Sequence, residues 1–283
     1  ESFESILAIE AVITDKTKTQ TIKLSRTFRF EEYKAEGEKS AVVKVIDNQN
    51  NEYLFVEEGD GVYKSQVEFG AQPNTSYTLY VETANGTVYT SSPEIVIPGP
   101  EMDNVYALAE TNDVGVDGIG VFVDAYDPNN AAQYHRFEYE ETHKILTPYR
   151  INEEAIVISV EPPIFEIVPK TKQDSICFST EKSKAIILGS SDGLNSSRLT
   201  KFNVRFLQSD NYKVRNRYSI NVKKHVISRE AYSFYELLNK FSGSQSLFSQ
   251  VQPGAVSGNI VSSNNCTDLM VNSIKISTII KTN

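Results

Sequence analysis

Two histidines bracket a group of carboxylates in the middle of the chain, and these side chains are the best suited to acid–base or metal chemistry. His135 and His143 stand eight residues apart, with Glu138 and Glu140 between them. If the segment is a strand, Phe137 faces away from both glutamates, which then lie on a solvated face. The spacing of the two histidines is also outside the compact patterns that bind zinc. We therefore expect neither a metal site nor a catalytic pair in this segment.

Two other polar segments contain groups that bind cations or act as nucleophiles. Asp124, Asp127, Asn129 and Asn130 carry oxygen ligands for calcium, but the glycine and the bidentate glutamate of an EF-hand loop are missing. The last three of these residues, around a proline, are instead typical of a turn. The serines of Gly189–Gly193 have neither the nucleophile-elbow pattern nor a nearby histidine. The sequence thus predicts no catalytic, cofactor-binding or metal-ligating residue, and a protein that is not an enzyme.

Composition narrows the class of protein further. The chain has 283 residues, with 15 Tyr and 14 Phe but 2 Met and no Trp, and this usage favours strands. Its net charge is −9 and its basic residues are scattered, so no nucleic-acid partner is expected. A run of about 18 apolar residues is missing, so no transmembrane helix is predicted. Cys177 and Cys266 could form one disulfide or remain two separate thiols, and separate thiols are the simpler expectation.

Residues 1–98 have the strand spacing of a β-sandwich. Turn residues separate short segments at intervals of about 8–12 residues. Tyr77 and Leu79 alternate with polar residues, and the segment from Pro73 to Leu79 resembles the tyrosine corner of immunoglobulin and fibronectin domains. Asn85-Gly86 favours a two-residue hairpin turn. We predict an immunoglobulin/fibronectin-like sandwich with strands at 6–13, 21–29, 41–47, 52–56, 62–69, 76–83 and 87–91.

Beyond a linker at Pro98–Pro100, residues 101–283 are predicted to form a second β-rich domain with one main α-helix, so the fold class is mainly β. Ser244–Asn265 is rich in polar residues and is expected to form a surface loop. The helix is expected near 228–242, with Ser228 as its N-cap and a buried apolar stripe of Ala231, Phe234, Tyr235, Leu238 and Phe241. Strands are expected at 119–125, 136–141, 156–160, 175–180, 184–188, 202–207 and 217–226.

Segments along nearly the whole chain resemble one bacterial family, in that family's order. They are Leu7–Asp15, Thr21–Thr27, Gly61–Ser65, Gly86–Ser91, Tyr134–Thr142, Cys177–Thr180, Ala231–Tyr235 and Ser257–Ile260. The chain is similar to Bacteroidota outer-membrane lipoproteins described as a domain of unknown function, whose genes commonly sit beside that of a TonB-dependent transporter. That family's closing Gly-Tyr-Phe-like strand has no counterpart after Ile260, which leaves the C-terminal segment without a predicted strand.

The resemblance implies a location and a partner, and it supplies no catalytic residue. It predicts a lipoprotein of the outer membrane, held at the cell surface by a lipid on a cysteine upstream of Glu1. There the protein would serve a TonB-dependent β-barrel in nutrient uptake, as a non-enzymatic accessory subunit. The alternative is a structural subunit of another outer-membrane assembly or secretion complex. An enzyme acting on glycans or peptides is the third and weakest interpretation.

Particular residues can be named for partner contact and for modification. Asp174-Ser175-Ile176 resembles the short acceptor motif for O-linked glycans on exported proteins of this phylum, which makes Ser175 the candidate acceptor. An ordinary strand start is the favoured alternative at that position. Polar groups on surface loops are suited to contacts with a partner. The candidates for such contacts are Asp127, Asn129, Asn130, Gln250 and Asn259.

Overall fold

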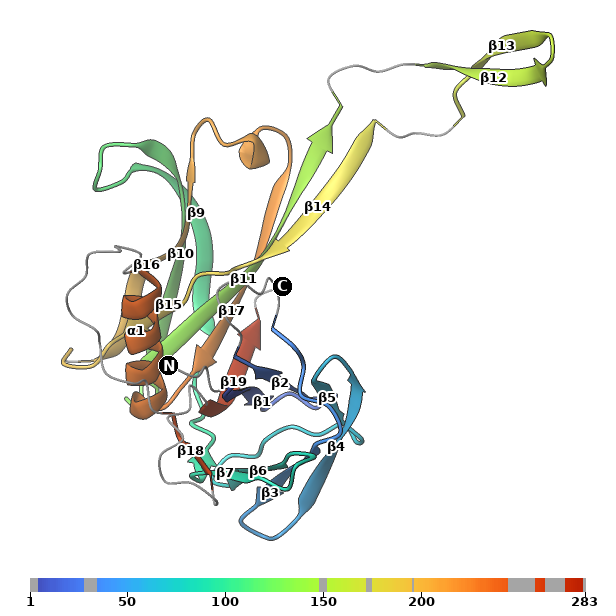
Figure 1. Cartoon of the computed structure of the whole chain (residues 1–283). Coiled ribbons are helices and arrows are strands. Elements are labelled where there is room, and N and C mark those ends of the chain that lie inside the picture. The colour runs from blue at the N-terminus through green and yellow to red at the C-terminus, as the bar shows by residue number, and fades with distance from the viewer. Residues whose placement is uncertain are drawn as a thin grey trace, which may run out of the picture.

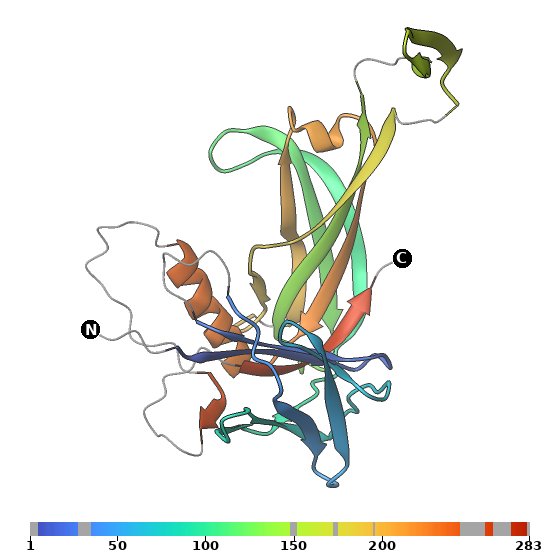
Figure 2. The ribbon, with the colours of Figure 1, turned by 45° about the vertical axis from the view of Figure 1, so that its right-hand side comes forward.

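The computed structural model of the chain describes residues 5–27, 35–147, 152–171, 175–194, 196–243, 258–262 and 273–281. As predicted, the fold is mainly β, with curled sheets and one α-helix in this part of the chain. Figures 1 and 2 show a lower group of strands from the N-terminal part, a taller upper group flanked by the helix, and a hairpin that projects from the upper end. Over the described ranges, no helix has the length and apolar character needed to cross a membrane.

The strands before Pro98 have the order of an immunoglobulin constant domain. One layer runs β1-β2-β5-β4, the other runs β3-β6-β7, and β4 pairs with strands of both layers. Alternation places Leu7 and Ile9 of β1 in the core while Glu10 faces solvent. The strands are β1 Leu7–Thr14, β2 Thr21–Arg26, β3 Val42–Asp47, β4 Glu52–Gly59, β5 Val62–Ser65, β6 Ser76–Glu82, β7 Val88–Ser91 and β8 Glu94–Ile95. A short strand from late in the chain, β18 Ile260–Ser262, pairs with β7.

Two local features of this sandwich follow from single residues. The hydroxyl of the buried Tyr77, at the start of β6, accepts a hydrogen bond of 2.9 Å from the backbone N–H of Gln72. This is the predicted tyrosine corner. The turn after β6 differs from the predicted two-residue hairpin, because the backbone bond from Thr83 to Thr87 encloses three residues. Gly86 takes φ 80°, which suits the residue that ends a three-residue hairpin loop.

The later strands form a second core between two sheets. A three-stranded sheet contains β9 Met102–Thr111, β10 Asp117–Asp127 and β16 Ser197–Gln208. Facing it are β11 Tyr134–Leu146, β14 Ile176–Lys182, β15 Ile187–Ser190 and β17 Tyr218–Val226, with the 3-10 helix η1 Tyr212–Val214 between β16 and β17 in the chain. Phe137 of β11 stacks on Phe202 of β16, with ring centroids 4.9 Å apart. The predicted strands here are present but mostly longer than expected, and β9 was not predicted.

The C-terminal strand β19 Ser273–Lys281, which the sequence did not predict, links the two groups of strands. It pairs in parallel with β1 and antiparallel with β17, so one hydrogen-bonded path runs from β14 to β18. The apolar cores on either side of Pro98–Pro100 are nevertheless separate. The division into domains at 1–98 and 101–283 stays a prediction. The change of core at that boundary favours the division, and the continuous strand pairing across β19 opposes it.

Helix α1 spans Arg229–Gly243, as predicted, and its N-cap is Ser228. The Ser228 hydroxyl accepts a 3.2 Å hydrogen bond from the backbone N–H of Ala231. Of the predicted apolar stripe, Tyr235 is buried, whereas Phe234 and Leu238 are only half-buried. The side chain of Phe241 lies outside the described part of the chain. Tyr235 is therefore the residue of the stripe that packs most tightly against the rest of the protein.

Between β11 and β14 the chain forms a separate two-stranded sheet. It consists of β12 Glu153–Val160 and β13 Pro163–Pro169. In both Figure 1 and Figure 2 this hairpin lies beyond the ends of β11 and β14, away from both cores. The sequence predicted only part of β12 and did not predict β13.

Candidate interaction surface

The residues that first suggested chemistry lie on β11, and the two histidines among them occupy the inner face of that strand. His135 and His143 are buried, 3% and 1% exposed. Glu138 is on the other face, as expected, and its carboxylate lies 3.4 Å from His225 Nε2 on the neighbouring strand. The hydrogen bond with His225 holds the pKa of Glu138 down, to about 2. The two histidines are thus buried on the inner face and Glu138 contacts His225 on the other face, so these groups do not form a solvent-facing acid–base pair.

Glu141 is the centre of a buried charged network at the upper end of this sheet. Its carboxylate accepts hydrogen bonds from Lys213 at 2.6 Å, from Arg205 at 3.0 and 3.2 Å, and from the Tyr218 hydroxyl at 2.8 Å. Burial alone would raise the pKa of Glu141, but the bonds from Lys213 and Arg205 outweigh it and lower the pKa. Since Lys213 also pairs with Glu181 at 3.0 Å, the network ties β11, β14, β16, β17 and η1 together. Its role is structural.

A second buried pair, Lys224 and His135, lies next to the Pro98–Pro100 segment. Lys224 is fully buried and its ammonium donates a 2.7 Å hydrogen bond to the carbonyl of Pro100. Burial lowers the pKa of Lys224 to about 8. Burial, together with the positive charge of Lys224, lowers the pKa of His135 to about 3. A lysine with a depressed pKa can act as a nucleophile, but this one is closed off from solvent and anchors the connecting segment to β17.

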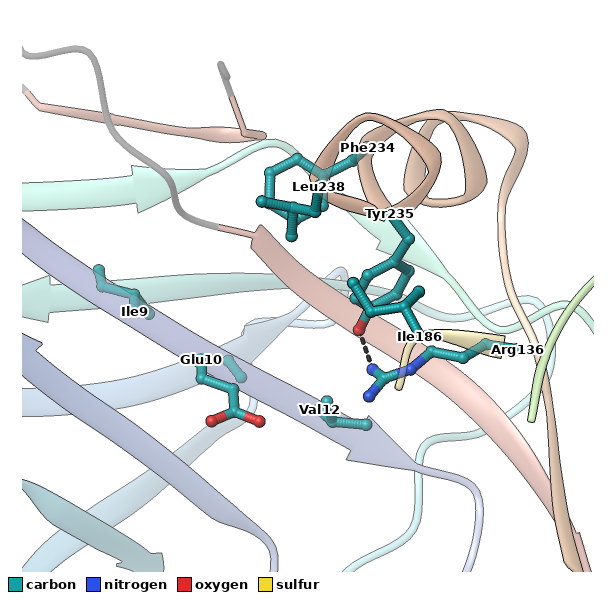
Figure 3. Close-up of a pocket in the computed structure, with 9 residues that line it drawn as sticks. Ile9, Glu10, Val12, Arg136, Ile186, Phe234, Tyr235 and Leu238 are labelled. Atoms are coloured by element: carbon teal, nitrogen blue, oxygen red, sulfur yellow. Dashed lines mark hydrogen bonds between the residues drawn. The ribbon is translucent and has the colours of Figure 1, made fainter. Parts of the chain in front are cut away.

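A cleft of about 270 Å³ runs between α1 and β1, and β19 passes between them (Figure 3). Among the described residues that line it, the cationic side chain is Arg136, which already donates to the Tyr235 hydroxyl, lies 4.3 Å from the centre of that ring, and pairs with Glu138 at 2.8 Å. Burial raises the pKa of Tyr235 to about 12, so the hydroxyl stays protonated. The described lining is otherwise mostly apolar: Ile9, Val12, Ile186, Phe234 and Leu238. The cleft lies at the interface between the helix and the sheet on which it packs.

The β12–β13 hairpin has the most unusual surface in the described chain. In its register Ala155 lies opposite Ile167 and Val157 lies opposite Phe165. Residues directly opposite each other in an antiparallel pair point to the same side. These four residues therefore form an uncharged patch on one side of the hairpin, which we call the apolar hairpin face, and Glu153 lies on the same side at its base. Val157, Phe165 and Ile167 are 58%, 63% and 69% exposed.

The opposite side of the hairpin is mixed. There Glu154 lies opposite Val168, and Ile156 lies opposite Glu166. A register shift between Val157 and Ser159 bulges β12 next to the tip. The carboxylates are thus kept off the apolar hairpin face and placed on the far side and at the ends of the hairpin.

This surface was not predicted from the sequence, and the reason is physical. The run Ala155–Val160 is apolar except for Ser159, and the run Ile164–Val168 is apolar except for Glu166. Such nearly continuous apolar runs are typical of strands buried on both sides. A usable signal was the short Glu161-Pro162-Pro163 turn between them, which confines both runs to one hairpin. A hairpin of only two strands cannot bury two apolar sides by itself.

The residues predicted for partner contact lie elsewhere. Asp127 is buried, and its carboxylate accepts bonds from the backbone N–H groups of Asn129, Ala131 and Ala132, which confirms the predicted turn. Asn129 and Asn130 are exposed on that turn. Asn259 is half-buried and donates to Glu94 at 2.8 Å, next to β18. Gln250 lies outside the described residues. Contact through any of these residues stays a prediction.

The candidate glycan acceptor Ser175 and the first cysteine follow the hairpin in the chain. Ser175 is half-buried just before β14, and its carbonyl accepts a backbone bond from Thr147. Glycosylation of Ser175 stays a prediction. Cys177 is a free, exposed thiol on β14, and Cys266 lies outside the described residues. Among the residues that the structure describes, no three His, Cys, Asp or Glu side chains are grouped so as to hold a metal ion.

Comparison with known proteins gives one family. The model of the family described as Domain of unknown function (DUF4249) matches residues 1–267. The match covers nearly all of the chain, and the chain therefore belongs to that family. No curated protein matches it.

Proposed function

We propose that this member of the DUF4249 family is a non-enzymatic binding subunit that attaches to a partner protein through the β12–β13 hairpin. The observation that carries the proposal is the exposure of Val157, Phe165 and Ile167 side by side on the apolar hairpin face. Contiguous exposed apolar surface rimmed by polar groups is typical of protein interaction sites. The exposed side chains include an aromatic ring, the kind of group that anchors interfaces.

The rest of the upper sandwich supports a docking role because it makes a firm base for the hairpin. Glu141 fastens β11 to β16 and β17 through Arg205 and Tyr218. β11 and β14, which lead toward the hairpin, pair over seven residue positions. The strands that lead toward the hairpin are thus held in a stable sheet.

The proposed partner is a TonB-dependent β-barrel in the outer membrane of a Bacteroidota bacterium, and the proposed task is nutrient uptake. This part rests on the resemblance to lipoproteins whose genes sit beside such transporters. The chain would be lipid-anchored at the cell surface. Because a single acyl chain holds a protein only marginally, contact with a barrel would add to retention at the membrane.

The alternative is a structural subunit of another outer-membrane assembly or secretion complex. It uses the same hairpin contact and differs in the protein that is bound. Identification of the bound protein therefore separates the two functions.

The test is purification of the tagged full-length protein from gently solubilised native membranes, followed by mass spectrometry. We expect a TonB-dependent barrel in near-stoichiometric amount, and its loss when Glu153–Pro169 is replaced by a short Gly-Ser turn. Val114→Ser is a matched control, because Val114 is 81% exposed on the loop between β9 and β10, away from the hairpin. Recovery of the full-length protein in the soluble fraction with no outer-membrane barrel would show that the proposal is wrong.

A further inference from the structure

The chemistry of the hairpin narrows the kind of surface that can receive it. An isolated two-stranded hairpin is at best marginally stable in water, and a packed apolar side is what stabilises such ribbons. The apolar hairpin face has no protein cover among the described residues, since Phe165 and Ile167 remain 63% and 69% exposed. The hairpin as it stands therefore lacks the contact that would fix it.

We infer that the apolar hairpin face inserts into an apolar groove of a partner protein, and that basic side chains rim this groove. The inference rests on the proposed binding function and specifies the chemistry of its contact. Phe165 is the central anchor, with Val157 directly opposite it and Ile167 beside it on the same face.

Charge is the reason for the basic rim. Residues 153–169 contain four glutamates and no lysine or arginine. Glu153 is at the base of the hairpin, Glu161 is at its tip, and Glu154 and Glu166 lie on the far side. A groove that takes in the apolar centre brings its own edges close to these carboxylates. Basic groups at those edges would pair with them, and acidic groups would repel them.

The same charges disfavour a lipid bilayer as the receiving surface. Glu161 lies in the turn between β12 and β13 and would enter the bilayer first. An acidic side chain is costly to place in the hydrocarbon of a bilayer. With no lysine or arginine in the hairpin, attraction to anionic head groups is also lacking.

A second copy of the chain is disfavoured on the same grounds. Two hairpins stacked through their apolar faces in opposite directions place Glu153 of each near Glu161 of the other. Stacking in the same direction places Glu153 and Glu161 of one copy beside Glu153 and Glu161 of the other. Either arrangement brings like charges together, which opposes association.

Docking is expected through the face of the hairpin rather than along its edges. β13 starts at Pro163 and ends at Pro169, and proline has no backbone N–H to donate. β12 carries the bulge next to the tip, which interrupts regular pairing. Both features weaken addition of a further strand, so the side chains of the apolar hairpin face carry the contact.

The experiment places a photo-crosslinking amino acid at position 165 of the full-length protein in its native cells, with matched probes at positions 156 and 114. Position 156 is on the far side of the same hairpin, and position 114 is on a distant exposed loop. We expect one protein adduct from position 165 and little or none from the other two. In affinity purification, Phe165→Ser and Glu161→Lys should each reduce recovery of that protein at least tenfold, while Ile156→Ser should reduce it much less.

The outcomes separate the inference from the proposed function. An adduct at position 165 with a protein that is not an outer-membrane barrel supports the inference and refutes the transporter function. Co-purification of a barrel that Phe165→Ser leaves undiminished, with no adduct at position 165, refutes the inference alone. If the protein with its hairpin but without its lipid anchor floats with vesicles of phosphatidylethanolamine and phosphatidylglycerol, the inference is refuted and the hairpin face binds a bilayer instead. An adduct between two copies refutes it in favour of self-association. Thermal unfolding of Phe165→Ser is expected to match the wild type, because Phe165 belongs to neither core.

Discussion

Acid should weaken this fold through one side chain, His135. It is 3% exposed on β11, and its positively charged neighbour Lys224 lies within the same buried region. Burial first, and the charge of Lys224 second, lower the pKa of His135 from 6.5 to about 3; Asp127 and a backbone hydrogen bond with Ala132 oppose this only in part. In the folded protein the imidazole therefore stays neutral down to strongly acidic pH.

The sign of the effect follows from the two pKa values. The unfolded chain takes up a proton at His135 near pH 6.5, whereas the folded chain does so only near pH 3. Between these values the unfolded state binds more protons, so the free energy of unfolding falls as the pH falls. One pH unit corresponds to about 1.4 kcal/mol, so the contribution lost between pH 6.5 and pH 5 is about 2 kcal/mol. Over the whole window it is on the order of 5 kcal/mol.

The assay is urea unfolding of the wild type and of His135→Phe at several pH values between 7 and 5. The carboxylates have ordinary pKa values near 4, so most of their titration lies below this range. The difference in free energy of unfolding between the two proteins should change by about 2 kcal/mol from pH 6.5 to pH 5, in the direction that favours the variant at low pH. Parallel loss of stability in both proteins over that range would refute the reasoning. Proton NMR of the folded wild type offers a direct check, because the His135 ring resonances should not titrate above pH 5.

Four further results are expected. Between pH 8 and pH 9.5 the free energy of unfolding of the wild type should rise by about 2 kcal/mol relative to that of Lys224→Met, measured by urea unfolding. The reason is that the pKa of Lys224 is about 8 in the folded protein and 10.5 in the unfolded chain, so only the unfolded chain keeps the proton in this range. Glu141→Gln should cost about 3–5 kcal/mol in the same assay, since it leaves the half-buried Arg205 without its counter-charge and the buried Lys213 with Glu181 alone, and equal stability would contradict that role. Tyr77→Phe should cost about 1–3 kcal/mol, because the N–H of Gln72 loses its acceptor, and an unchanged denaturation midpoint would count against the tyrosine corner. For Ser175, intact mass of the protein from its native cells should show no glycan at this position, and a mass increase that Ser175→Ala abolishes would establish the glycan.

The N-terminal sandwich could be predicted because its residues satisfy local and global rules together. In β6, Tyr77 and Leu79 are buried while their neighbours are half-buried, as strand alternation requires. The tyrosine corner adds a second, independent signal from the same few residues. The helix was equally predictable, since Ser228 caps it and Glu230 lies in its first turn.

Other parts depend on pairing between residues far apart in the chain. β19 pairs with β1, at the other end of the sequence, and nothing local identifies that partner. The role of Glu141 was missed for a related reason. Strand alternation places it on the inner face of β11, yet only the fold reveals that Arg205 and Lys213 arrive there from β16 and η1. Charge partners of this kind leave no mark in spacing or composition.

The distribution of side chains in this protein argues for function by contact. Groups that could do chemistry, such as His143, Glu141 and Lys224, are enclosed and mostly paired within the upper sandwich. Apolar groups that would ordinarily be enclosed, Phe165 and Ile167, are instead exposed on β13. The hairpin that contains them projects from the end of the molecule (Figure 2). Exposed apolar surface of this kind lowers solubility and favours aggregation, so its presence on an otherwise well-packed scaffold needs a compensating role. A partner with an apolar, basic-rimmed groove provides one, because it covers the face that the chain leaves open and pairs with the carboxylates around it.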